Sequence, residues 1–185
     1  MPIITITMED GGVITAELYP DKAPNTVNNF ISLANSGWFE GKVFHRASPD
    51  FMIQGGSPDG TGSSAGFPYS IKGEFASAGF KKNDLKHTPG VLSMARMGPS
   101  TRWEDPAPYY DTASCQFFIM NAVYPSLDGE YAAFGKVTAG MDVVDRIANL
   151  PADNNMILLA PPAIKSVTVD LNGYKFTEPA TIPAQ

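Results

Sequence analysis

The residues best placed to do chemistry together flank a short turn. Arg46 ends one apolar segment, Ala47-Ser48-Pro49-Asp50 turns the chain, and Phe51-Met52-Ile53-Gln54 begins the next. If both segments are strands of a hairpin, the alternation of side chains allows Arg46, Met52 and Gln54 to share one face. A cation, a thioether and an amide beside an aromatic ring would form an apolar pocket with a few placed donors. The pattern equally fits an ordinary arginine that solvates a strand end, and the hairpin alone does not separate the two interpretations.

Cysteine and histidine offer a second kind of chemistry, because Cys115 could act as a nucleophile with a histidine as its base. Cys115 heads the apolar run at 116–120, which favours a buried and inert thiol. His45 lies between Phe44 and Arg46 and is expected to be structural, whereas His87, before Thr88-Pro89-Gly90, is expected to be a turn residue. No cluster of ligands at metal-binding spacing occurs, so no metal site is predicted.

Glycine-rich segments give no cofactor site. The segment Gly60-Thr61-Gly62-Ser63-Ser64-Ala65 formally fits a dinucleotide fingerprint, but Gly66-Phe67-Pro68 follows where a helix should begin. The spacing from Gly55 to Gly60 resembles a phosphate loop but lacks the lysine and hydroxyl residues that contact phosphate. We therefore expect no cofactor.

Short strands must position these residues. Alternating apolar residues predict a hairpin over residues 3–19, and helical spacing predicts one helix from Pro24 to a stop at Gly37 and another near 140–149. Further strands are predicted at 43–46, 51–55, 91–95, 116–120 and 133–137, with a last one spanning Val167, Val169 and Leu171.

These elements predict a mainly β fold, a closed eight-stranded antiparallel β-barrel capped by two α-helices, with a two-sheet sandwich as the alternative. Residues 1–185 read as one domain with an irregular C-terminal tail from about 177. Two long connections, 56–70 and 97–115, stand out, and long loops in compact domains are usually functional or mobile.

Composition agrees with a turn-rich β domain, since 17 glycines and 16 prolines exclude a helical bundle. The net charge of −6 and the lack of any basic run longer than Lys81-Lys82 argue against nucleic-acid binding. No apolar run could span a membrane and no signal peptide is visible. With Cys115 as the single cysteine, we expect a cytoplasmic protein, and we expect a monomer.

Several short motifs, spread over most of the chain, together resemble those of one known family. Phe44-His45-Arg46, Phe51-Met52-Ile53-Gln54-Gly55-Gly56, Leu85-Lys86-His87-Thr88 and Gly90-Val91-Leu92-Ser93-Met94-Ala95 resemble the signature of the cyclophilin-type peptidyl-prolyl cis/trans isomerases. Gln116-Phe117-Phe118-Ile119, Leu127-Asp128-Gly129 and Phe134-Gly135-Lys136-Val137 continue it, in order, over about residues 3–170.

The resemblance implies an enzyme that accelerates rotation about X–Pro bonds in proline-containing peptides and in unfolded or folding proteins. It implies Arg46 as the catalytic residue and a proline-ring pocket walled by Phe51, Met52, Phe118 and Leu127. By the same resemblance Gln54 and Gln116 would position the peptide, with Ala95, Arg96 and Tyr131 completing the binding residues. A non-catalytic module that binds proline-containing segments is the rival interpretation, and a Cys115-dependent hydrolase ranks third.

Several positions depart from the family pattern. Ser126 stands where drug-sensitive eukaryotic members have Trp, which argues against tight cyclosporin binding. Tyr131 replaces a frequent His, Arg96 a frequent Asn, and Cys115 a usual Ser. The 97–115 loop is longer than the common pattern, and the resemblance assigns it no role.

Overall fold

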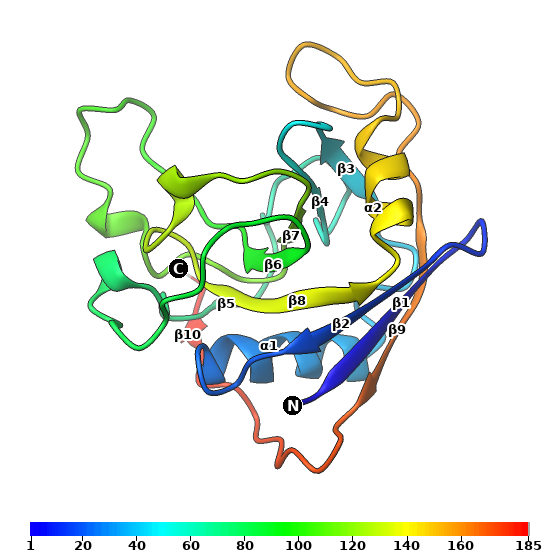
Figure 1. The fold of residues 1–185 in the computed structure, drawn as a ribbon. Coiled ribbons are helices and arrows are strands. Elements are labelled where there is room, and N and C mark those ends of the chain that lie inside the picture. The colour runs from blue at the N-terminus through cyan, green and yellow to red at the C-terminus, as the bar shows by residue number, and fades with distance from the viewer. Residues whose placement is uncertain (185) are drawn as a thin grey trace.

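The body of the structure, a computed structural model that describes residues 1–184, is a strongly curled antiparallel sheet of eight strands (Figure 1). In spatial order the strands are β3 (Phe44–Ala47), β4 (Met52–Gly55), β7 (Phe117–Met120), β6 (Val91–Met94), β8 (Ala133–Ala139), β2 (Val13–Leu18), β1 (Ile3–Met8) and β9 (Ile164–Asp170). The predicted strands are all present within a few residues of their expected positions. β9 begins earlier than its alternating valines indicated.

The sheet is not a closed barrel, which corrects one part of the predicted fold. Its edge strands β3 and β9 share no ladder. They approach only just outside their ends, at an isolated bridge between Val43 and Ala163. The outer edge of β3 is otherwise covered by the loop between α2 and β9, where the Ala47 amide donates to the Met156 carbonyl at 2.9 Å and the Leu158 amide to the His45 carbonyl at 2.9 Å. The connection is irregular there because Met156 adopts a positive φ of 65°.

Two α-helices pack on different parts of the sheet, as predicted. α1 (Pro24–Asn35) begins with proline at its first turn and buries Val27, Phe30 and Ile31. Its first turn is capped from a distant loop, because the buried Glu74 carboxylate accepts from the Thr26 amide at 2.5 Å and the Thr26 hydroxyl at 2.7 Å. A carboxylate at this end also complements the helix dipole.

α2 (Met141–Ala148) follows β8 through Gly140, whose φ of +96° suits only glycine, and a Cβ there would collide with the Val13 carbonyl.

Inside the curled sheet, an aromatic cluster fills the core. The ring of Phe117 meets Phe30 at 5.3 Å and Phe39 at 5.4 Å, both edge-on.

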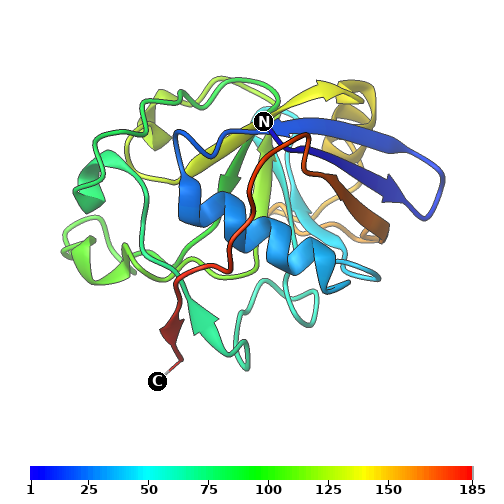
Figure 2. The same cartoon turned by 90° about the horizontal axis from the view of Figure 1, so that it is seen from below.

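The C-terminal tail is more ordered than predicted. It crosses α1 (Figure 2), where the Tyr174 hydroxyl donates to Asn28 at 3.0 Å and Asn25 donates to the Ala180 carbonyl at 2.9 Å. Residues 177–181 lack regular structure, but β10 (Ile182–Pro183) pairs with β5 (Tyr69–Ser70) within the first long loop.

Short 3₁₀ helices break the remaining loops: η1 (Ala76–Ala78), η2 (Ala107–Tyr109) and η3 (Pro125–Leu127). In the 97–115 loop, Trp103 is 82% exposed and does not pack on the sheet, whereas Tyr110 packs against the buried ring of Phe75. Within residues 1–184 no helix has the length and apolar character needed to cross a membrane. The same residues contain no group of three His, Cys, Asp or Glu side chains arranged to hold a metal ion.

Candidate active site

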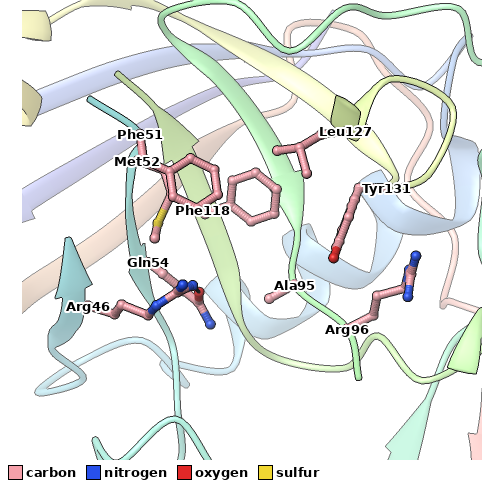
Figure 3. A pocket seen from close by; sticks show the side chains of 9 residues that line it. All are labelled: Arg46, Phe51, Met52, Gln54, Ala95, Arg96, Phe118, Leu127 and Tyr131. Carbon is pink, nitrogen blue, oxygen red and sulfur yellow. Dashed lines mark hydrogen bonds between the residues drawn. The ribbon is translucent and has the colours of Figure 1, made fainter. Parts of the chain in front are cut away.

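One pocket collects nearly all the predicted site residues. A cavity of about 180 Å³ lies over residues of β3, β4 and β7 and over the segment that follows β6 (Figure 3), and it is lined by Arg46, Phe51, Met52, Gln54, Ala95, Arg96, Phe118, Leu127 and Tyr131. Gln116 is the one predicted residue outside this lining. It lies behind Gln54 and contacts it directly.

A polar chain runs along one side of the pocket. Arg46 and Gln54 face each other in the β3–β4 register, and the Arg46 guanidinium donates to the Gln54 side-chain oxygen at 3.2 Å. The Gln54 amide donates to the Gln116 oxygen at 3.1 Å, and the Gln116 amide donates to Ser64 Oγ at 2.8 Å and the Gly62 carbonyl at 2.8 Å. The predicted sharing of one face by residues of the hairpin is therefore observed, and the first long loop holds the far end of the chain.

Burial lowers the pKa of Arg46, but a guanidinium begins so far above neutrality that it stays charged. Its carbon lies 5.8 Å from the centre of the Phe51 ring. Among residues 1–184 no carboxylate forms a salt bridge with Arg46. The positive charge therefore faces the pocket with only an amide as its side-chain partner.

The opposite wall is apolar. Met52 and Phe118 are nearly completely buried and belong to a small hydrophobic cluster separate from the main core. Phe51, Leu127 and Tyr131 pack around them as half-buried rims, and the ring of Tyr131 meets Phe118 edge-on at 5.9 Å. In Figure 3 these side chains surround a common space beside the guanidinium of Arg46.

Arg96 has a different environment from Arg46. Its guanidinium carbon lies 4.4 Å above the Tyr131 ring and 5.3 Å from each of the Phe75 and Tyr110 rings. Its nitrogens also donate to the Glu130 carbonyl at 2.9 and 3.1 Å. These contacts fix the Arg96 guanidinium against the rings and the backbone at the pocket rim. Arg96 therefore has a structural part in the pocket wall.

Sequence reasoning missed two contributors. Tyr124 stacks on Phe51 with ring centres 4.4 Å apart, and no spacing in the sequence pointed to this contact. His87 was expected in a turn, but it is 1% exposed and lies behind Phe118. The backbone does turn there, with the Thr88 amide donating to the Lys86 carbonyl at 3.1 Å, but hydrogen bonds to distant residues draw the ring inward.

The nucleophilic alternative has no support in the geometry. Cys115 is completely buried, and burial raises the pKa of its thiol, which disfavours the thiolate. Its side-chain partner is Ser114, so no histidine base is in reach through the contacts of residues 1–184. His45 is buried, as expected for a structural residue.

Known proteins are similar to this chain in sequence and in fold. The family model described as cyclophilin type peptidyl-prolyl cis-trans isomerase/CLD matches residues 3–169. The chain is 42% identical over 142 residues to peptidyl-prolyl cis-trans isomerase B of Bacillus subtilis (strain 168), covering 77% of this chain and 87% of that protein. It is 41% identical over 145 residues to peptidyl-prolyl cis-trans isomerase ppi1 of Schizosaccharomyces pombe, covering 78% and 84%.

Solved structures agree. A crystal structure of a cyclophilin type peptidyl-prolyl cis-trans isomerase from Cryptosporidium parvum matches with a TM-score of 0.75 and 29% identity, over 91% of this chain and 96% of that one. A second structure of that protein, in the presence of the dipeptide Ala-Pro, matches with a TM-score of 0.73 over 91% and 98%.

The chain belongs to the cyclophilin-type peptidyl-prolyl cis-trans isomerases. It is accordingly an enzyme whose reaction is the cis-trans isomerisation of the peptide bond before proline.

Proposed function

We propose that the pocket between Arg46 and Phe118 binds the proline ring of a protein substrate and that Arg46 stabilises the twisted amide. The observation that carries this proposal is the placement of the Arg46 guanidinium, without a carboxylate partner in the described chain, across the cavity from an apolar wall. The dipeptide named in one related structure contains proline, which agrees with a proline-sized occupant.

Rotation about the X–Pro bond must break amide resonance, against a barrier of roughly 18–20 kcal/mol. In the twisted state the prolyl nitrogen becomes pyramidal and more basic, and the dipolar resonance form is lost. An apolar wall of Phe51, Met52, Phe118 and Leu127 disfavours the planar, dipolar ground state while it holds the ring. A donor aimed at the prolyl nitrogen or its carbonyl stabilises the twisted state selectively, as catalysis requires.

No bond is made or broken in this mechanism, so no covalent intermediate is needed. Gln54 and Gln116 hold the guanidinium and offer amide groups to the peptide backbone. Ala95 directly follows β6 on the rim of the same cavity, where its amide donates to the Gln116 carbonyl at 3.1 Å and its own carbonyl can accept from the peptide. The substrates we propose are proline-containing segments of unfolded or folding proteins. A cytoplasmic and monomeric enzyme stays a prediction from the sequence.

Two-dimensional exchange NMR on a short Ala-Pro peptide tests the proposal directly. We expect substoichiometric protein to produce cis-trans exchange peaks, with chemical-shift changes in Phe118 and Met52 on titration. Exchange without involvement of these residues would overturn the proposed pocket. Peptide binding without faster exchange would favour the binding-module interpretation.

A further inference from the structure

His87 forms a buried polar link directly behind the apolar wall of the pocket. Its ring is fully enclosed, with Nδ1 3.1 Å from Asp128 Oδ1 and Nε2 2.9 Å from Ser93 Oγ. Ser93 lies on β6, paired in register with Phe118 of β7. Asp128 directly follows Leu127, at the end of η3. One side chain therefore joins the sheet to the loop that carries part of the pocket.

The backbone of His87 strengthens the same link. Its amide donates to Asp128 Oδ1 at 2.7 Å, and its carbonyl accepts from the Tyr124 amide at 2.9 Å. The imidazole also lies flat behind Phe118, with ring centres 6.0 Å apart, and meets Tyr131 edge-on at 6.5 Å. His87 thus contacts or anchors two parts of the apolar wall, Phe118 on β7 and the loop from η3 to Tyr131, and no contact within residues 1–184 joins it to Arg46 or Gln54.

The partners define one protonation state of the ring. A carboxylate can only accept, so Nδ1 carries the proton and Nε2 accepts from the Ser93 hydroxyl. Burial lowers the pKa of His87 more than Asp128 raises it, which keeps the ring neutral. All polar atoms of the ring are then satisfied, and the link has a single geometry.

We propose that His87 is a positioning residue that sets the spacing between Phe118 and the Leu127–Tyr131 segment, and so the fit of the proline ring. The inference rests on the proposed pocket function. Because the Arg46–Gln54 side is anchored separately, loss of the link should weaken substrate binding more than it slows the rotation step.

The substitution His87→Phe tests this, because it keeps a flat ring behind Phe118 and removes both nitrogens. We expect KM for an Ala-Pro peptide to rise about tenfold with kcat changed less than about threefold, as loss of buried hydrogen bonds that act on binding alone predicts. Asp128→Ala should behave alike, and Asp128→Asn should restore most of the loss because its amide oxygen still accepts from Nδ1. Val144→Ala, a buried change in α2 at a residue of the main core that does not line the pocket, is the control for a general loss of stability.

An unchanged KM in folded His87→Phe, or the same KM increase in Val144→Ala, would overturn the positioning role. If His87→Phe does not fold, the variants Asp128→Ala and Asp128→Asn test the proposal by themselves. Equal KM values in Asp128→Ala and the wild type would then contradict it. Nitrogen NMR of the wild-type imidazole gives an independent readout, with a protonated Nδ1 expected and a protonated Nε2 contradicting the link. The imidazole signal does not depend on activity, so it tests the His87 link separately from the proposed function. Absence of catalysis by the wild type would reject the proposed function and leave the NMR result on His87 standing.

Discussion

The Arg46 guanidinium and the Gln54 amide lie opposite each other on neighbouring strands, with Nη1 3.2 Å from Oε1. Gln54 accepts from the arginine with its oxygen and donates to Gln116 with its nitrogen, so the amide has one orientation. The arginine is therefore held by a directional neutral partner that leaves its charge uncompensated. A carboxylate at the same place would offset the charge that the proposed mechanism uses.

Removal of the guanidinium should affect turnover far more than folding. We expect Arg46→Ala to lower kcat by roughly 100- to 1000-fold, as for other single donors to a transition state. A protease-free isomerisation assay measures the rate, with circular dichroism to verify the fold. Arg46→Lys retains the positive charge but lacks the planar guanidinium, so its kcat should lie between those of the wild type and Arg46→Ala. Near-normal activity in a folded Arg46→Ala protein would refute the role given to Arg46.

Loss of the amide partner should loosen the arginine without removing it. For Gln54→Ala we expect kcat to fall about tenfold, from one lost hydrogen bond near 1 kcal/mol and a less ordered guanidinium. Stopped-flow kinetics over a range of peptide concentrations separates kcat from KM. Lys136→Ala, an exposed change on β8, serves as the control and should leave both constants unchanged. A Gln54→Ala enzyme with unchanged kcat would show that Arg46 needs no holding.

Cyclosporin sensitivity should depend on position 126. Ser126 is exposed on η3 beside the pocket residue Leu127, and its small polar side chain offers little apolar area. We expect weak inhibition of the wild type and at least about tenfold tighter inhibition of Ser126→Trp, because an indole adds a large contact surface. Inhibition titrations with Ser126→Ala as the control would measure this. Tight inhibition of the wild type would contradict the prediction.

Acid should destabilise the folded state through its two buried histidines. Burial is the first cause that lowers the pKa of both His45 and His87 from the ordinary value of 6.5. Below that value the unfolded chain binds protons that the folded chain does not. The free energy of unfolding should therefore be level above about pH 7.5 and fall below 6.5, by about 1.4 kcal/mol per pH unit for each neutral histidine.

Urea denaturation between pH 5 and pH 8 would measure this dependence. Subtracting the free energy of unfolding of His87→Phe from that of the wild type separates the contribution of His87 from that of the carboxylates. This difference should become smaller as the pH falls. A pH-independent difference would mean that His87 titrates alike in the folded and unfolded chain.

The strands and helices were predictable because each carries its own periodic pattern. Ile4 and Ile6 alternate with threonines in β1, and their complete burial follows directly from that alternation. The Arg46–Gln54 face was equally local, since one short turn joins the two strands. The identity of the reaction came from the resemblance of many motifs, and no single pattern would have supplied it.

Long-range polar contacts were beyond such reasoning. The cap on α1 comes from Glu74, and the partners of His87 come from Ser93 and Asp128, each set by tertiary folding. The turn-like neighbourhood of His87 therefore gave no sign that its ring is buried. The expected closed barrel failed for a similar reason, because ladder pairing at the last edge depends on the irregular loop around Met156.

The outer edge of β3, which no strand of the sheet pairs with, also has a consequence for the order of folding. The outer hydrogen bonds of this strand come from Met156, Leu158 and Pro162. A nascent chain that has emerged only as far as α2 has Arg46, its amide partner and the whole apolar wall, yet β3 then has no neighbour on one side. We therefore expect the pocket to reach its final form only after residues 156–162 have joined the fold.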